Sequence, residues 1–281
     1  MSAYHAKGVR GAGVRIGVID TGAEEAPKRD FQGLRAAKHG LAVSSILTGL
    51  RGHFEGIAPD STVSVIDLQT SKNIPISAVL RAIESAIQEG VDILSISLGT
   101  TDSWGPMQAA INKALERNIL VFAAAGNSGD RGYEYPSACA GAISVASINQ
   151  ARQPSAFNTR NDATVVFAPG EQLSLPLGNG ELAEFSGTSF ATPFAAGLAA
   201  LALSEKRATE PKALIKRRDM IDLLRSDTHL GLNCTTHTYV MEPTCTEITR
   251  SVGVGPKPSS PILSLLLVLL LLGLVFYVSR L

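Results

Sequence analysis

The chain has 281 residues, with 25 basic and 25 acidic side chains and a formal net charge of zero. This balance gives no indication of nucleic-acid binding or of electrostatic attachment to a membrane surface. Three cysteines are too few for a disulfide-stabilised scaffold, and Cys139 lies in an apolar stretch where we expect it to be buried. About 250 residues precede an apolar tail, enough for one α/β domain with a sizeable core.

Apolar runs typical of strands alternate along the chain with segments of helical periodicity. The strand-like runs are rich in Val and Ile and mostly continuous, which indicates a sheet covered on both faces. The expected strands span 14–20, 62–68, 92–98, 119–125, 143–148 and 164–168. The expected helices span 39–50, 76–89, 106–117, 188–204 and 212–225. This alternation predicts an α/β fold, with a doubly wound, mainly parallel sheet and helices on both faces.

Folds of this kind carry their functional groups at the carboxyl ends of the strands. Asp20, Gly99 and Asn127 each stand at such an end. His39 opens the helix expected over 39–50, and Ser189 opens the small-residue helix expected over 188–204. A helix N-terminus offers free N–H groups and a positive dipole end, which suit a developing oxyanion. The same serine peptide is also compatible with an ordinary helix cap.

Three of these residues form a set able to hydrolyse peptide bonds. Ser189 is the candidate nucleophile, and His39 is the base that takes its proton and passes it to the leaving amine. Asp20 holds the imidazole tautomer and stabilises the imidazolium. Taken singly, each residue has an ordinary structural role as a turn, cap or packing residue. The chain order Asp, His, Ser is the order found in subtilisin.

Four segments resemble the motifs of the subtilisin-like serine protease (subtilase) family and occur in the family's order. They are 14–22 (Val-Arg-Ile-Gly-Val-Ile-Asp-Thr-Gly), 38–46 (Lys-His-Gly-Leu-Ala-Val-Ser-Ser-Ile), 123–128 (Ala-Ala-Ala-Gly-Asn-Ser) and 187–193 (Gly-Thr-Ser-Phe-Ala-Thr-Pro). The resemblance covers roughly residues 4–231, and the serine motif is its most specific part. It implies a subtilisin-like fold and serine endopeptidase activity on a protein or peptide substrate, without a cofactor.

The resemblance also implies roles for residues around the three catalytic candidates. Asn127 supplies its side-chain amide to the oxyanion, together with the backbone N–H of Ser189. The segment Ser97, Leu98 and Gly99 pairs with the substrate backbone and shapes the first specificity pocket. The opposite wall of that pocket is formed by the pair Ala125 and Gly126. The apolar lining expected there favours an aliphatic or aromatic substrate side chain.

The chain departs from the family pattern around the histidine. Leu41 and Ala42 stand where the family usually has Thr and a second His, and Ser44 and Ser45 replace a small Ala-Gly pair. Asp20 and His39 are only 19 residues apart, which is short for the family. The loop between them often carries calcium ligands, so its shortening leaves no metal site to be expected.

The region after residue 231 has a different composition. A cysteine-containing extension spans 232–250, where Cys234 and Cys245 either pair or remain free thiols. A Pro/Gly/Ser linker follows at 251–261, and 262–278 holds 17 residues without charge. As a helix this last segment is about 25 Å long, near the lower limit for a bilayer span. We expect a single-pass membrane helix rather than a buried core helix, with the side of the membrane left open.

Three functions remain in competition. The first is a membrane-anchored serine endopeptidase whose catalytic domain spans 1–231, and the second is a catalytically inactive subtilase-fold protein that binds peptides or partners. The third, a nucleotide-binding protein, is suggested by the glycine pair in 11–13, but this pair precedes a strand instead of following it. Residues 1–13 lack the apolar run of a signal peptide. We therefore expect a cytosol-facing, tail-anchored form or a true start further upstream.

Overall fold

The computed structural model describes residues 2–21, 39–68, 74–102, 104–177 and 180–226. The extension, linker and membrane helix expected after residue 231 lie outside these residues, as do Cys234 and Cys245. Within the described ranges, no helix combines the length and apolarity needed to cross a membrane. Cys139 is 3% exposed, as expected, and burial raises the pKa of its thiol to about 11.

The centre of the fold is a six-stranded sheet, and it contains all six strands expected from the sequence. These are β1 (Arg15–Asp20), β4 (Thr62–Asp67), β5 (Ile93–Ile96), β6 (Leu120–Ala124), β7 (Ile143–Ile148) and β8 (Thr164–Pro169). Their order is β4-β1-β5-β6-β7-β8, and every neighbouring pair is parallel. The chain order changes direction between β1 and β5, so a crevice for ligands is expected outside the carboxyl ends of these two strands.

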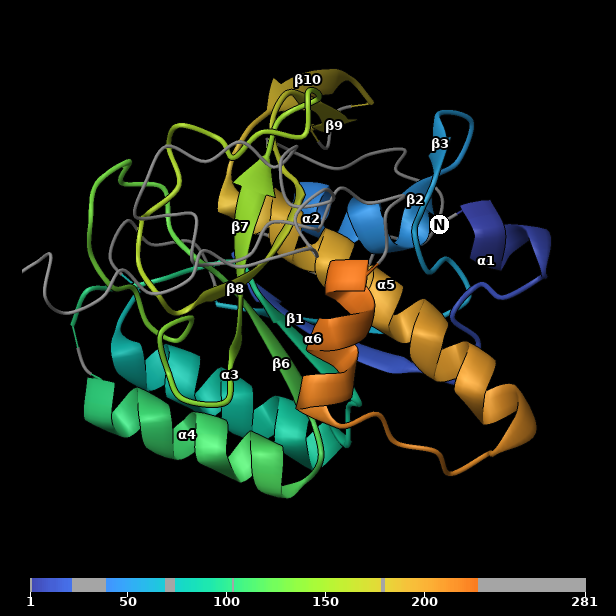
Figure 1. Cartoon of the computed structure of the whole chain (residues 1–281), viewed down its shortest axis with the longest axis horizontal. Coiled ribbons are helices and arrows are strands. Elements are labelled where there is room, and N and C mark those ends of the chain that lie inside the picture. The colour runs from blue at the N-terminus through green and yellow to red at the C-terminus, as the bar shows by residue number, and fades with distance from the viewer. Residues whose placement is uncertain (1, 22–38, 69–73, 103, 178–179, 227–281) are drawn as a thin grey trace, which may run out of the picture. The chain divides into compact units, whose positions relative to one another are not determined.

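Helices cover both faces of this sheet, as predicted (Figure 1). One face carries α2 (His39–Thr48), α5 (Thr188–Thr209) and α6 (Arg217–Ser226), and the other carries α3 (Ile76–Glu89) and α4 (Trp104–Glu116). Strand residues alternate between the two cores: in β6, Phe122 packs on the α5 side and Val121 on the α3 and α4 side. Because both faces are buried, the central strands β5 and β6 are buried along their whole length, whereas the edge strand β4 is only partly buried.

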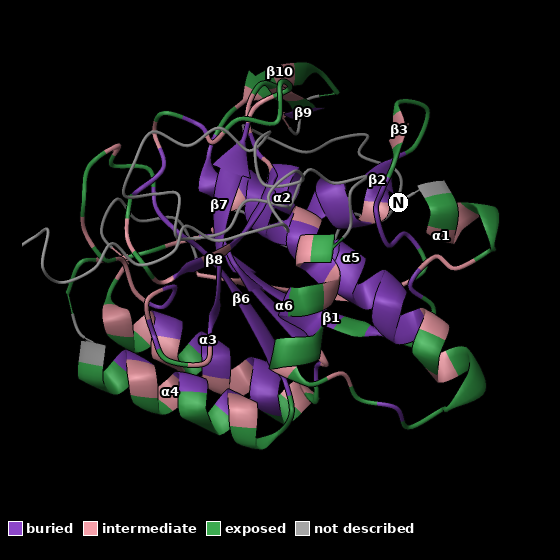
Figure 2. Ribbon diagram, in the orientation of Figure 1, coloured by how far each residue is buried: buried purple, intermediate pink, exposed green. Residues whose placement is uncertain are grey.

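The longest helix, α5, is the packing centre of its side of the sheet. Figure 2 shows β6, β7 and most of α5 buried, whereas α3 and α4 each expose one flank. The small residues of α5 allow close approach: a Cβ on Gly197 would lie 2.8 Å from Cγ2 and 2.9 Å from Cβ of Ile57. The run of alanines in α5 therefore reflects tight packing of this helix as well as helix propensity.

Five short elements were not expected from the sequence. They are α1 (Ser2–Ala6), the hairpin of β2 (Gly49–Leu50) with β3 (Phe54–Glu55), and the hairpin of β9 (Leu173–Pro176) with β10 (Leu182–Phe185). Two to five residues carry too little periodicity to be recognised.

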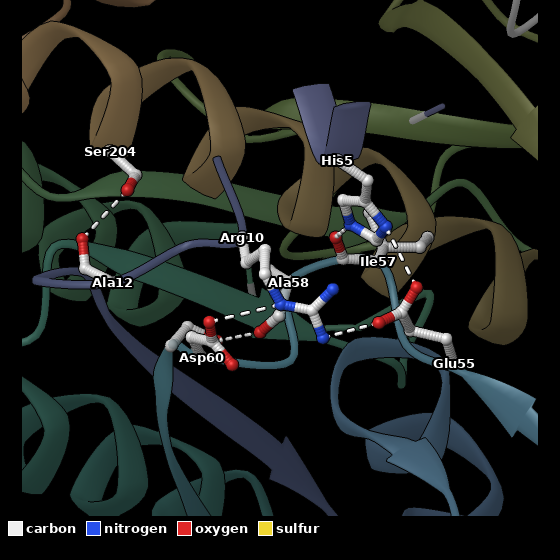
Figure 3. Close-up of polar contacts among 9 residues, drawn as sticks. His5, Arg10, Ala12, Glu55, Ile57, Ala58, Asp60 and Ser204 are labelled. Atoms are coloured by element: carbon white, nitrogen blue, oxygen red, sulfur yellow. Dashed lines mark hydrogen bonds and ion pairs between the residues drawn. The ribbon is translucent and has the colours of Figure 1, made fainter. Parts of the chain in front are cut away.

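The N-terminal segment is held to the domain by polar contacts (Figure 3). Arg10 forms ion pairs with Glu55 and, at 3.2 Å, with Asp60. The ring of His5 lies 3.1 Å from Glu55 and 2.9 Å from the carbonyl oxygen of Ile57. The hydrogen bond from Arg10 lowers the pKa of Glu55, so this surface network is formed at neutral pH. It fastens the segment that leads into β1.

Gly197 gives a direct test of the packing of α5. We expect Gly197→Ala to lower the free energy of unfolding by up to about 2 kcal/mol, because overpacking costs about 1–3 kcal/mol and helix propensity returns about 1 kcal/mol. The comparison change Gly132→Ala lies in a loop where nothing approaches within 4 Å, and is expected to be neutral or stabilising by up to about 1 kcal/mol. Urea unfolding of both variants measures the difference. Equal effects would contradict the packing described here.

Candidate active site

Asp20 and His39 meet at the carboxyl edge of the sheet. Asp20 is the last residue of β1 and 2% exposed, and His39 is the first residue of α2. Nδ1 of His39 lies 2.7 Å from Oδ1 of Asp20, which also accepts a hydrogen bond from the backbone N–H of Thr21 at 2.6 Å. A carboxylate can only accept, so Nδ1 carries the proton. The basic lone pair of the neutral imidazole is therefore on Nε2.

The two side chains change each other's proton affinity. Burial lowers the pKa of His39, but the hydrogen bond and the negative charge of Asp20 outweigh it, so the pKa lies above the ordinary value for histidine. Burial raises the pKa of the Asp20 carboxyl, and the hydrogen bond from His39 opposes this rise. The ion-pair partner thus stabilises a protonated His39 that burial alone would disfavour.

Ser189 lies in the first turn of α5 and contacts the end of β5. Its hydroxyl donates to the carbonyl oxygen of Ser97 at 3.2 Å, and the hydroxyl of Ser97 donates to the carbonyl oxygen of Ser189 at 2.7 Å. The next residue, Phe190, packs on His39 with ring centroids 5.2 Å apart. The structure therefore brings Asp20, His39 and the N-terminus of α5 to one place, although Ser189 is 150 residues from His39 in the chain.

Asn127 follows β6 and faces the same helix end. Its Oδ1 accepts hydrogen bonds from the backbone N–H of Thr188 at 2.8 Å and from the Thr188 hydroxyl at 3.0 Å. Because a backbone N–H can only donate, the atom bound to it is Oδ1, and Nδ2 is left as the donor. A Cβ on Gly187 would lie 3.5 Å from this Nδ2. The donating group thus lies beside the residues that precede Ser189.

The two segments assigned by resemblance to a specificity pocket extend from neighbouring strands. Ser97, Leu98 and Gly99 follow β5, and Ala125 and Gly126 follow β6, which pairs with β5. Ser97 and Ala125 are buried, Leu98 is half-buried and Gly99 is exposed.

The expected apolar lining of this pocket is incomplete, because a carboxylate lies against both glycines. Oε2 of Glu134 is 2.6 Å from the place of a Cβ on Gly99, and a Cβ on Gly126 would overlap Oε1. Sequence reasoning missed Glu134, since it belongs to neither a motif nor a periodic element. Its only signal was its position directly before the turn at Tyr135 and Pro136.

The departures from the family pattern are accommodated within α2. Ser44 and Ser45 are fully buried, and each hydroxyl donates at 2.7 Å to a carbonyl oxygen of the preceding turn. Leu41 and Ala42 are buried apolar residues. Among the residues that the structure describes, no group of three His, Cys, Asp or Glu could hold a metal ion.

The pairing of Asp20 with His39 predicts that removal of the Asp20 charge reverses the direction in which the pKa of His39 is shifted. We expect the pKa of His39 in the intact protein to lie above about 6.5, and Asp20→Asn to lower it below this value, because only burial then acts. NMR titration of the imidazole measures both values. Glu116→Gln, on the exposed end of α4, is the matched control and leaves the pKa unchanged. An unshifted His39 in Asp20→Asn would contradict the assignment.

Known proteins resemble this chain over most of its length. The subtilase family model matches residues 11–227. The chain is 32% identical over 216 residues to a thermostable alkaline protease of Halalkalibacterium halodurans, covering 71% of this chain and 59% of that protein. It is 30% identical over 249 residues to subtilisin of Bacillus pumilus, covering 82% and 89%. The chain thus spans less than two thirds of the first relative and most of the second.

Solved structures agree with this result. A cold-adapted subtilisin-like serine proteinase superposes with a TM-score of 0.65 at 26% identity, covering 79% of this chain and 88% of that one. The prenylagaramide maturation protease PagA shares the fold, with a TM-score of 0.69 at 24% identity over 81% and 88%. The match of the family model to most of the described domain shows that this chain belongs to the subtilase family.

Proposed function

We propose that the protein is a serine endopeptidase that works through Asp20, His39 and Ser189 and forms an acyl-enzyme. The observation that carries this proposal is the 2.7 Å hydrogen bond between buried Asp20 and His39, made beside the N-terminus of the helix that holds Ser189. The names of two relatives at 30% identity or more, a subtilisin and an alkaline protease, support the same activity.

The first half of the reaction follows from the protonation state of His39. With its proton on Nδ1, His39 can accept a proton only at Nε2. The Ser189 hydroxyl rotates from the carbonyl oxygen of Ser97 to this nitrogen and attacks the substrate carbonyl carbon. The proton moves to Nε2, and the charge of Asp20 stabilises the imidazolium. His39 then protonates the leaving amine, which leaves the acyl group on Ser189.

The second half of the reaction reverses these roles with water. Water replaces the amine, gives a proton to Nε2 and attacks the ester carbon, and the returned proton releases Ser189. In both halves, the negatively charged former carbonyl oxygen of the substrate accepts hydrogen bonds from Nδ2 of Asn127 and from the backbone N–H of Ser189. Thr188 holds the Asn127 amide in the required orientation in advance. Removal of one oxyanion donor typically costs about 10²–10³-fold in kcat.

The substrate is a protein or peptide in an extended conformation. The exposed Gly99 at the end of β5 allows a peptide backbone to approach and pair with the segment 97–99. Main-chain hydrogen bonds of this kind provide affinity without regard to sequence, and the neighbouring pocket provides side-chain preference.

The catalytic domain is proposed to span 1–231 and to be attached by the linker 251–261 to a membrane helix at 262–278. This part of the proposal is supported by the sequence, in which 17 uncharged residues follow a stretch rich in proline and glycine. The peptide substrate would then be cut close to a membrane surface.

One observation favours the alternative of an inactive, peptide-binding member of the family. The Ser189 hydroxyl donates to Ser97 in this structure, and an enzyme must turn it toward His39. We expect a fluorophosphonate probe to label the full chain, because the Asp20–His39 pair activates the hydroxyl. Ser189→Ala and His39→Ala are expected to remove labelling, whereas the neighbouring Ser186→Ala keeps it. A folded but unlabelled wild-type chain would establish the inactive alternative.

The membrane helix is tested separately by flotation with vesicles of neutral lipid. The full chain is expected to float with the vesicles, and a chain ending at residue 250 to remain at the bottom of the gradient. Neutral lipid is chosen because the chain has no net charge to bind an anionic surface. If both chains remain at the bottom, the apolar segment is not a membrane helix.

A further inference from the structure

The carboxylate of Glu134 lies between the two segments that flank the proposed specificity pocket. Its Oε2 approaches Gly99 after β5, and its Oε1 approaches Gly126 after β6. A Cβ at either position would meet a carboxylate oxygen, and Gly126 also needs glycine because its φ is +107°. The carboxylate of Glu134 is therefore in contact with both segments at once.

Hydrogen bonds of Glu134 and its neighbours hold this residue in place. Thr159 donates its hydroxyl to Oε1 at 2.9 Å, and the backbone N–H of Thr159 donates to the carbonyl oxygen of Gly126 at 2.9 Å. Tyr135 exchanges two backbone hydrogen bonds with Thr100, at 2.8 and 3.0 Å. The hydroxyl of Ser137 donates to the Glu134 carbonyl oxygen at 2.7 Å. The carboxylate is thus fixed by its own backbone and by one hydroxyl.

The negative charge of Glu134 has no cationic partner within the described part of the chain. No Lys, Arg or His nitrogen described in the structure lies within 4.0 Å of its oxygens, and Thr159 occupies Oε1 alone. The side chain is half-buried. A substrate side chain that enters this pocket removes water from the carboxylate, and an apolar one leaves the charge without compensation.

We propose that Glu134 makes the pocket select a basic substrate residue, arginine or lysine, on the acyl side of the cleaved bond. The inference rests on the proposed function and names the substrate class of the same site. A guanidinium or ammonium group replaces the lost water and pairs with Oε2, whereas neutral side chains are rejected by the uncompensated charge. This replaces the aliphatic or aromatic preference expected from the sequence.

The test uses the full chain and a series of peptidyl coumarin amides that differ only in the residue before the scissile bond. Substrates with arginine or lysine at this position are expected to have a kcat/KM roughly 10²-fold higher than those with glutamine, phenylalanine or alanine. This ratio is in the range of coupling energies measured for close charge pairs across an interface. Glu134→Gln keeps the shape and removes the charge, and the arginine-to-alanine ratio is expected to fall at least about 10-fold. Glu116→Gln, an exposed glutamate on α4 away from the site, is the matched control and keeps the wild-type ratio.

Benzamidine provides a second readout, because it carries an amidinium but no peptide backbone. It is expected to inhibit the wild type competitively and Glu134→Gln at least about 10-fold more weakly. If Glu134 has a purely structural role, Glu134→Gln lowers kcat/KM equally for all substrates and leaves the arginine-to-alanine ratio unchanged. This result would overturn the inference. A wild type that prefers alanine would show instead that Glu134 closes the pocket to all but small side chains.

Fluorophosphonate labelling separates this inference from the proposed function. If wild type is labelled but shows no preference for arginine or lysine, the assignment of Glu134 is wrong and the protease remains. If wild type is not labelled, the proposed function fails, and this inference fails with it. Labelling of Glu134→Gln reports whether Ser189 is still activated, so a misfolded variant is recognised.

Discussion

The site depends on how the N-terminus of α5 is fastened to the ends of two neighbouring strands. Ser189 and Ser97 exchange hydrogen bonds at the end of β5, and Thr188 binds Asn127 at the end of β6. These contacts hold the first turn of α5 at hydrogen-bonding distance from the residues that follow β5 and β6. The small residues in the rest of α5 are buried, so the position of Ser189 is set by the core of the domain. The position of Ser189 and the packing of α5 are thus determined by the same contacts.

Charge at this edge is arranged in two different ways. Asp20 is buried and paired with His39, so its charge is used inside the protein to hold a proton in place. Glu134 is half-buried and has a single hydroxyl partner, so its charge is directed to the space between two glycines. In the proposed reaction, the first arrangement stabilises the positive charge that appears on His39. The second leaves a charge to be compensated by whatever enters, which is a basis for selecting a substrate.

Much of the framework could be predicted from the sequence, because both faces of a parallel sheet must be covered. All six strands of the sheet were recognised as mostly continuous runs rich in Val and Ile, and the five long helices were placed by their periodicity and small residues. Asp20, His39 and Asn127 were proposed as site residues because they stand at element ends, in segments that resemble the family motifs. What the sequence could not show are contacts between distant segments, such as the exchange of hydrogen bonds between Ser97 and Ser189. Glu134 was missed for the same reason, because neither motif nor period connects residue 134 to Gly99 and Gly126, which its carboxylate approaches.

The most direct test is the crystal structure of the chain after reaction with a peptidyl phosphonate that has arginine next to the phosphorus. We expect phosphorus bonded to Oγ of Ser189 and a phosphonyl oxygen within hydrogen-bond distance of Nδ2 of Asn127 and the N–H of Ser189. Nε2 of His39 should lie next to Oγ, and the guanidinium should contact Glu134. The account would be contradicted by a phosphonate bound to another residue. It would also be contradicted if the Ser189 hydroxyl still donated its hydrogen bond to Ser97, with His39 turned away.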